Sequence, residues 1–297
     1  MKHSSERVIR LLFDDRRSFG SREHYFHFAW GYLLPALDRI LQDAVLDGGH
    51  VYELQSCGPM MDPRSRELAG WLEPSLRIVD AMQPGEATTS GQLVPRWDCW
   101  LRGRTSLRIR WASRLHRLGL RHPVLRGIDR VRDFIMAHAL AGPSPSPEAA
   151  REGAEWLLLK RSDEPHFYRP DGPAEKPNYG LTRRSIANLE ALAVELESRG
   201  RPVRIYEPGK DDLATQVRTY HAAAGVIGIR GAELANIVWM RPGSGVVMLV
   251  TPVKRENNVA RHLAMVRELR MQQIAVDSDH PIVSADSVWQ ATVDAGR

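Results

Sequence analysis

The chain has 297 residues, of which 43% are hydrophobic and 26% charged, as in ordinary globular proteins, so composition excludes a disordered or collagen-like chain. Its two cysteines, Cys57 and Cys99, have no CxxC spacing and no nearby Cys/His set, which argues against a disulfide framework and a zinc site. The length predicts two domains of about 150 residues each. Because the N-terminus lacks the apolar region of a signal peptide, we expect a cytoplasmic protein, with peripheral membrane contact left open.

The first 141 residues alternate between strand and helix patterns. A short apolar run covers residues 7–13, and the stretch HYFHFAWGYLLPALDRILQDAV (24–45) has the apolar spacing of a helix, with Pro35 as a kink. Further along, the patterns predict a strand over 50–55, a helix over 64–72 and a strand over 75–82. This alternation is typical of an α/β domain.

The formal net charge of +5 hides a strongly basic helical segment, residues 102–140. Ten arginines lie between 102 and 132, against the single acid Asp129. An apolar stripe and an arginine stripe run side by side along a predicted amphipathic helix, formed by Trp111, Leu115 and Leu118 and by Arg110, Arg114, Arg117 and Arg121.

The pattern of 102–132 favours contact with an anionic membrane surface or an anionic glycan. A plain solvated helix face is the alternative. Nucleic acid is the least favoured partner, because no recognised reader motif accompanies the arginines.

The stretch GPSPSPE (142–148) predicts a linker between domains 1–141 and 149–297, since consecutive Pro and Ser sustain neither helix nor sheet. Beyond it, strands are predicted over 155–161, 202–208, 225–229, 245–251 and 272–277. Helices are predicted over 185–200, 212–224, 231–240, 259–269 and 287–295. Short connections between alternating strands and helices indicate a parallel sheet covered on both faces.

One turn of this second half has the composition of a phosphate site. A buried strand ends at Ile229, Arg230 and Gly231 form the turn, and a helix is predicted to begin at Ala232. Unpaired N–H groups at a helix start attract phosphate, and an arginine adds bidentate contacts. Every doubly wound fold has such turns, so a purely structural role remains the alternative.

Four segments, in the right order, resemble glycosyltransferase family 61, the DUF563-type capsular polysaccharide enzymes. The segment AAAGVIGIRGAELANIVWMRPGS matches the C-terminal signature at Ala224, Val226, Ile227, Gly228, Gly231, Ala232, Leu234, Asn236, Met240, Pro242, Gly243 and Ser244. Arg161, Arg184 and Asn188 match a second motif, Gln216 matches a glutamine before the signature, and HYFHFAWGYLLPAL matches a fourth motif at His27 and Pro35. Arg230 stands where the family has His, Glu233 where it has Gly, and His24 where it has Asn.

The resemblance implies an α/β, GT-B-like fold in which two Rossmann-like domains face each other across a cleft. It also implies an inverting transfer of a sugar from a nucleotide-sugar donor, bound by the C-terminal domain, to a glycan or lipid-linked acceptor in surface or capsular polysaccharide biosynthesis. The reaction would need no cofactor and no metal. The acidic pairs at 14–15 and 211–212 suit a turn and a helix N-cap better than a metal site.

Such a displacement needs a general base for the acceptor hydroxyl and cations for the departing diphosphate. For the base we name His27 or Asp14. For the donor we name Arg161, Arg230 and the N–H groups of Gly231, Ala232 and Glu233, with Arg184 and Lys160 as second choices and Glu207 as a candidate for a ribose hydroxyl. Two other classes stay open: a non-catalytic nucleotide- or glycan-binding protein on the same fold, and a pyruvyl-type sugar-modifying transferase.

Overall fold

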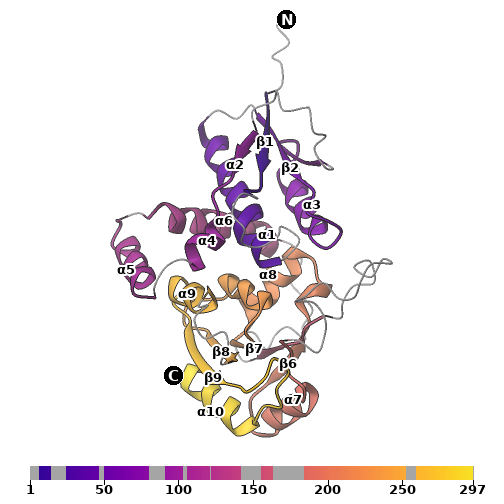
Figure 1. Cartoon of the computed structure of the whole chain (residues 1–297), viewed down its shortest axis with the longest axis vertical. Helices are drawn as coiled ribbons and strands as arrows, with labels where there is room; N and C mark the ends of the chain where they lie inside the picture. The colour runs from indigo at the N-terminus through magenta and orange to yellow at the C-terminus, as the bar shows by residue number, and fades with distance from the viewer. Residues whose placement is uncertain are drawn as a thin grey trace, which may run out of the picture. The chain divides into compact units, whose positions relative to one another are not determined.

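The computed structural model describes residues 7–14, 25–46, 50–79, 91–102, 106–120, 122–141, 155–162, 184–251 and 259–296. The chain divides into two compact units, Met1–His138 and Ala139–Arg297. The expected linker 142–148 lies outside the described residues. Each unit is built on its own parallel sheet (Figure 1). Among the helices that the structure describes, none combines the length and the apolar character that crossing a bilayer requires.

The sheet of the first unit has four parallel strands in the order β3-β2-β1-β4. The strands are β1 (Arg7–Leu12), β2 (His50–Gln55), β3 (Leu76–Val79) and β4 (Gly91–Leu93). Strands β2 and β3 confirm the sequence prediction, β1 lies in the short apolar run at the start of the chain, and β4 was not predicted. It is only three residues long, and it pairs with β1 beginning at Arg10 and Gly91.

The helices of the first unit include the predicted helix around Pro35, which is built in three parts. They are α1 (Tyr25–Phe28), a π-helix η1 (Ala29–Leu33) and α2 (Leu34–Leu46), so the irregular turn lies just before the proline. The fold continues with α3 (Asp62–Trp71), α4 (Trp97–Arg102), α5 (Ser106–Arg117) and α6 (Pro123–Ala141). As expected, the basic segment is helical and breaks before Pro123.

The sheet of the second unit has five parallel strands in the order β6-β5-β7-β8-β9. They are β5 (Trp156–Leu159), β6 (Val203–Tyr206), β7 (Gly225–Ile229), β8 (Gly245–Val250) and β9 (Arg270–Ala275). The helical elements are α7 (Leu189–Ser198), η4 (Pro208–Lys210), α8 (Leu213–Ala222), η5 (Ala232–Trp239), α9 (Val259–Val266) and α10 (Ala285–Gly296). This confirms the predicted parallel α/β sheet.

Helices cover both faces of this sheet, with α7 and α10 on one side and α8 and α9 on the other (Figure 1). Alternate strand residues point to each face, and those facing α7 and α10 form one buried core, which includes Leu158, Ile227 and Leu249. The Trp156 indole extends this core beside Gly225 and Gly245, where any Cβ would overlap its ring.

The predicted α-helix over 231–240 is wrong in type, because residues Ala232–Trp239 form a 3-10 helix. This element lies in the connection 230–244, which leads the chain from the end of β7 back to the start of β8. A 3-10 helix rises about 2.0 Å per residue against about 1.5 Å for an α-helix, so eight residues cover more of that distance.

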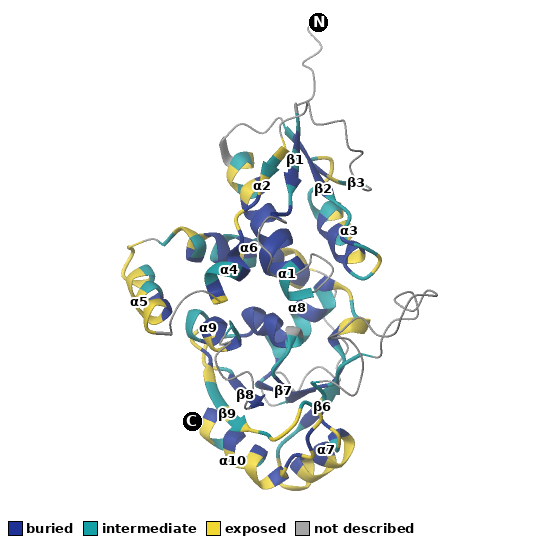
Figure 2. Cartoon of the chain, viewed as in Figure 1, coloured by how far each residue is buried: buried dark blue, intermediate teal, exposed yellow. Residues whose placement is uncertain are grey.

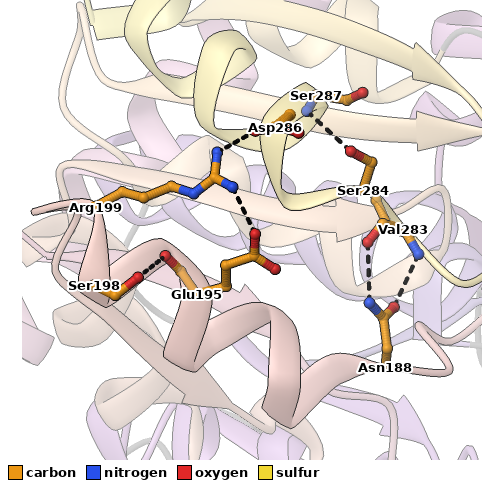
Figure 3. Close-up of polar contacts among 8 residues, drawn as sticks. All are labelled: Asn188, Glu195, Ser198, Arg199, Val283, Ser284, Asp286 and Ser287. Atoms are coloured by element: carbon orange, nitrogen blue, oxygen red, sulfur yellow. Dashed lines mark hydrogen bonds and ion pairs between the residues drawn. The ribbon is translucent and has the colours of Figure 1, made fainter.

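Asn188, one of the residues that match the family motif, has an architectural role at the start of α7. Its Nδ2 donates to the carbonyl oxygen of Val283 over 3.0 Å, and its Oδ1 accepts from the Val283 N–H over 2.9 Å (Figure 3). Further along α7, Arg199 bridges Glu195 and Asp286. These contacts fasten α7 to α10 and to the segment before it.

We predict that Asn188→Ala lowers the free energy of unfolding by about 2 kcal/mol, because two hydrogen bonds are lost and the backbone groups of Val283 lose their side-chain partner. Urea unfolding followed by circular dichroism measures the change. The control is Glu195→Gln, which weakens an exposed ion pair in the same cluster and should leave the midpoint unchanged. Equal stability of wild type and Asn188→Ala would contradict the architectural role.

Candidate functional site

The second sheet has a topological switch point between β5 and β7. Counted within this unit, its strand order is 2-1-3-4-5, in which the connections from the first and second strands leave toward opposite faces. Ligands of open α/β sheets bind outside the carboxyl ends of the strands at such a point. The candidate residues Arg161 and Arg230–Glu233 follow directly after these two strands, β5 and β7.

Side chains from the two strand ends meet across this switch point. The Nε of Arg161 lies 4.0 Å from Oε1 of Glu233, and the two side chains are 14% and 23% exposed. The Glu233 carboxylate also lies over Gly231, where a Cβ would overlap it. Arg230 is half-buried, and its backbone N–H donates to the Leu249 carbonyl, which joins the turn to β8. The predicted cation and turn residues are therefore adjacent.

Two other predicted residues lie at the same edge of the sheet but make different contacts. Glu207 follows β6, and its carboxylate pairs with Nζ of Lys210 at 2.9 Å. Arg184 precedes α7 and has a positive φ of 55°. The next residue, Ser185, donates its N–H to the carbonyl of Asp279, beyond the carboxyl end of β9. The place of Arg184 beside the donor stays a prediction.

A buried polar pair holds the η5 segment after the turn. The Asn236 amide donates to Oε1 of Gln216 over 2.9 Å, and Gln216 donates to the Asp211 carbonyl over 3.0 Å. The Tyr220 hydroxyl donates to the Glu233 carbonyl over 2.9 Å. Both members of the pair match the family motif. Their hydrogen bonds give a structural reason for that match, because they fix the backbone that presents residues 230–233. A buried amide left without partners would cost about 1–3 kcal/mol.

The first sheet has a corresponding switch point between β1 and β4, at which Asp14 lies. The Val94 N–H donates to the Leu12 carbonyl, which continues the pairing to the end of both strands. Arg96, just beyond β4, donates from Nη1 to the carbonyl oxygen of Asp14 over 3.0 Å. Asp14 itself is only 8% exposed. His27, the other candidate for the general base, contacts Asp98, which is bound to the same Arg96. The two candidates therefore lie beside one cluster, formed by Arg96 and Asp98.

That cluster is centred on Asp98, which is fully buried. Oδ2 of Asp98 accepts from Nη2 of Arg96 over 2.6 Å and lies 2.7 Å from Nδ1 of His27, while Oδ1 accepts from Nε of Arg96 over 2.8 Å. Burial alone would raise the pKa of Asp98, but the hydrogen bonds and positive charge of Arg96, with the hydrogen bond of His27, outweigh it and lower the pKa to about 2.

The ionised Asp98 carboxylate has a direct consequence for the imidazole of His27. A carboxylate only accepts hydrogen bonds, so Nδ1 of His27 is the protonated nitrogen of the neutral ring. The basic lone pair then lies on Nε2, and the side chain is 16% exposed. A carboxylate that orients a histidine in this way is the arrangement found behind general bases in many enzymes.

The sequence analysis missed Arg96 and Asp98. They follow a strand of three residues, GQL, that shows no alternation long enough to detect, and Asp98 is 71 positions from His27. One signal was available in the sequence: Pro95 stands just before a helical pattern that has Asp98 in its first turn.

No group of three or more His, Cys, Asp or Glu side chains that could hold a metal ion occurs within the described ranges. One acidic pair named from the sequence has the predicted structural role, because Asp212 caps α8 by accepting from the Thr215 N–H over 2.6 Å. For the other pair, Asp15 lies outside the described residues.

Residues 110–247 match the family model described as Glycosyltransferase 61. No curated protein matches the chain. The matched segment extends from α5 to β8 and contains Arg161, Arg184, Glu207 and the turn 230–233, but neither His27 nor Asp98. It confirms the resemblance drawn from the motifs: residues 110–247 of this chain are similar to glycosyltransferase family 61.

Proposed function

We propose that the protein transfers a sugar from a nucleotide-sugar donor to a hydroxyl group of a glycan or lipid-linked acceptor. The observation that carries this proposal is the position of Arg161 and of the turn 230–233 at the β5/β7 switch point, inside the segment that matches the family. Arginine guanidinium groups and backbone N–H groups at such a point suit a nucleoside diphosphate. The GT-B-like arrangement of two facing domains is part of the proposal.

In the proposed reaction, the acceptor oxygen attacks the anomeric carbon while the bond from that carbon to the diphosphate oxygen breaks. The hydroxyl proton passes to Nε2 of His27, which Asp98 orients through Nδ1. The electron pair of the broken bond goes to the diphosphate, where Arg161 and Arg230 offset the negative charge. One displacement of this kind inverts the anomeric configuration.

The proposal gives Glu233 a distinct role. Its carboxylate lies beside Arg161 and over Gly231, so it reduces the positive potential that a diphosphate would experience there. Glu233 could instead accept hydrogen bonds from hydroxyl groups of the donor. The alternative function is a non-catalytic nucleotide- or glycan-binding protein on the same fold, and Arg230 and Glu233, which depart from the family pattern, are the residues that favour it.

We predict that Arg230→Ala weakens the binding of the matching nucleotide at least tenfold, or about 1.4 kcal/mol, because a charge-assisted phosphate contact is lost. Glu233→Gln should have the opposite effect, since it removes a negative charge next to Arg161. Calorimetric titration of the full chain with UDP, GDP, CMP and dTDP measures both changes.

The matched control for this titration is Arg204→Ala, which removes an arginine of the same unit that pairs with Glu155 before β5. Its affinity should equal that of the wild type. If Arg230→Ala also binds as the wild type does, Arg230 does not contact the donor.

We predict that His27→Gln lowers the rate of sugar transfer at least 100-fold and leaves nucleotide affinity unchanged, because a positioned general base contributes about 10²- to 10⁴-fold. Asp98→Asn should also lower kcat, with little change in KM for the donor. Asp98→Glu, which keeps a carboxylate, should have a kcat between those of Asp98→Asn and the wild type. Transfer assays with a panel of nucleotide sugars give these values.

Asp98 is buried against Arg96, so its substitution also affects stability, and thermal unfolding of each variant has to accompany the assays. The control is Asp62→Asn, another buried aspartate of the first unit, which accepts hydrogen bonds from Ser56 and the Cys57 N–H. If the two variants are equally stable and Asp98→Asn loses no more activity than Asp62→Asn, the role of Asp98 is structural only.

We also propose that the transfer needs no divalent metal, because arginines at the switch point can offset the charge of the diphosphate. EDTA is therefore expected to leave the transfer rate unchanged, and added Mg²⁺ or Mn²⁺ should not raise it. Activity that disappears with EDTA and returns with Mn²⁺ would require a metal in the mechanism.

A further inference from the structure

An unusual number of large apolar side chains are exposed on and just after α5. They are Leu107, Trp111, Leu115, Leu118 and Leu120, with exposed fractions of 63%, 56%, 38%, 71% and 64%. Large exposed hydrophobic residues elsewhere in the described chain, such as Val194 and Ile282, are far apart in the sequence and lie in different segments. Figure 2 shows α5 coloured mostly as exposed. Single exposed apolar side chains are common, but a contiguous set indicates a contact surface.

These side chains form a stripe on the helix face that points away from the protein. The opposite face carries Ile109, which is fully buried, and Ser113, which is 6% exposed. On the buried side, Nε2 of His116 bonds to Asp129 of α6 over 2.7 Å and ties α5 to the first unit. At 100° per residue, Leu107, Trp111 and Leu118 lie about half a turn from Ile109. We call the residues Leu107, Trp111, Leu115 and Leu118 the outer stripe.

Exposed arginines border the outer stripe on both sides. Helical spacing places Arg110, Arg114 and Arg117 along one edge and Arg108 along the other, and all four are exposed. Residues 106–120 contain no acidic residue. The helix therefore presents an apolar strip between positive borders.

We propose that α5 docks on an anionic membrane surface, with the outer stripe among the lipid headgroups and acyl chains and the arginines against lipid phosphates. An amphipathic helix with an apolar face, an aromatic residue and basic flanks is the form that lies in the plane of a bilayer interface. A soluble anionic glycan would contact the arginines but would leave the outer stripe exposed to water, so the lipid surface accounts for both features. This inference goes beyond sugar transfer and does not depend on the donor site.

Co-sedimentation with vesicles tests the proposal on the full chain. Vesicles of phosphatidylcholine containing about one-third phosphatidylglycerol should bind the protein at least tenfold more tightly than phosphatidylcholine alone at roughly 0.1 M salt. Arg110→Gln combined with Arg114→Gln should weaken binding about 25-fold, because each arginine contributes about fivefold. This effect should fade at roughly 1 M salt, since salt screens the attraction between arginine and lipid phosphate. Trp111→Ser combined with Leu118→Ser should weaken binding more than tenfold at both salt concentrations.

Two double variants serve as controls. Val194→Ser with Ile282→Ser removes equally exposed apolar side chains from the second unit, and Arg66→Gln with Arg261→Gln removes two exposed arginines outside α5. Both should bind vesicles as the wild type does. All altered residues of α5 are exposed, so the thermal unfolding midpoint should not move.

Two results would overturn the proposal. The first is equal binding of wild type and α5 variants to anionic vesicles. The second is a binding loss caused by the arginine variant alone, with competition by soluble hyaluronate, which would identify an anionic glycan as the partner. Quenching of Trp111 by brominated lipid, measured as the difference between wild type and Trp111→Phe, would add direct evidence for insertion.

Discussion

Parallel strand pairing is the constraint on which both candidate sites depend. Each strand of a parallel sheet has to be reached by a connection that returns to the opposite edge, so all strands end at the same edge. Where successive connections leave toward opposite faces, the segments after two neighbouring strands separate and leave room for a ligand. This happens between β5 and β7 in one unit and between β1 and β4 in the other. Arg161, Arg230, Asp14 and Arg96 lie at these points because they follow those strands directly.

The two sites are held rigid by different means. In the first unit, Arg96 and Asp98 form a buried, charged pair joined by two hydrogen bonds, with side chains no more than 1% exposed. Such a pair costs desolvation, which only good geometry and further hydrogen bonds offset, and here His27 and the Asp14 carbonyl complete the set. In the second unit, neutral hydrogen bonds from Tyr220, Gln216 and Asn236 fix the backbone instead. The charges near the turn, at Arg161 and Glu233, are more exposed and further apart, so they can adjust to a ligand.

Local patterns in the sequence were enough for most of the fold. Buried strands such as β7 and β8 are largely apolar runs that begin with a glycine, and the N-cap residue Asp212 marks the start of α8, so these elements could be predicted from spacing and capping alone. The three-residue β4 could not, because its pairing with β1 depends on tertiary contacts rather than on its own residues. The 3-10 form of η5 was missed for a related reason, since an amphipathic pattern does not distinguish the two helix types.

The candidate site was predictable only in part for the same physical reason. Arg161 and the turn 230–233 could be found because strand ends can be located from the sequence. Asp98 could not, because its partner His27 is distant in the chain and is brought to it only by the pairing of β1 with β4. Conversely, the match to a family motif gave no indication that Asn188 and Gln216 serve the backbone rather than the ligand.

The division of the motif into architectural and ligand-facing residues bears on the two departures from the family pattern. Gln216 and Asn236 hold the η5 segment through hydrogen bonds in which the side chains of Arg230 and Glu233 take no part. Arg230 in place of His adds a permanent positive charge, and Glu233 in place of Gly adds a negative one at neutral pH. The formal charge of the turn therefore stays close to that of the family pattern with a neutral histidine. The departures redistribute charge at the turn without a change of its formal total, which favours an altered ligand over a lost site.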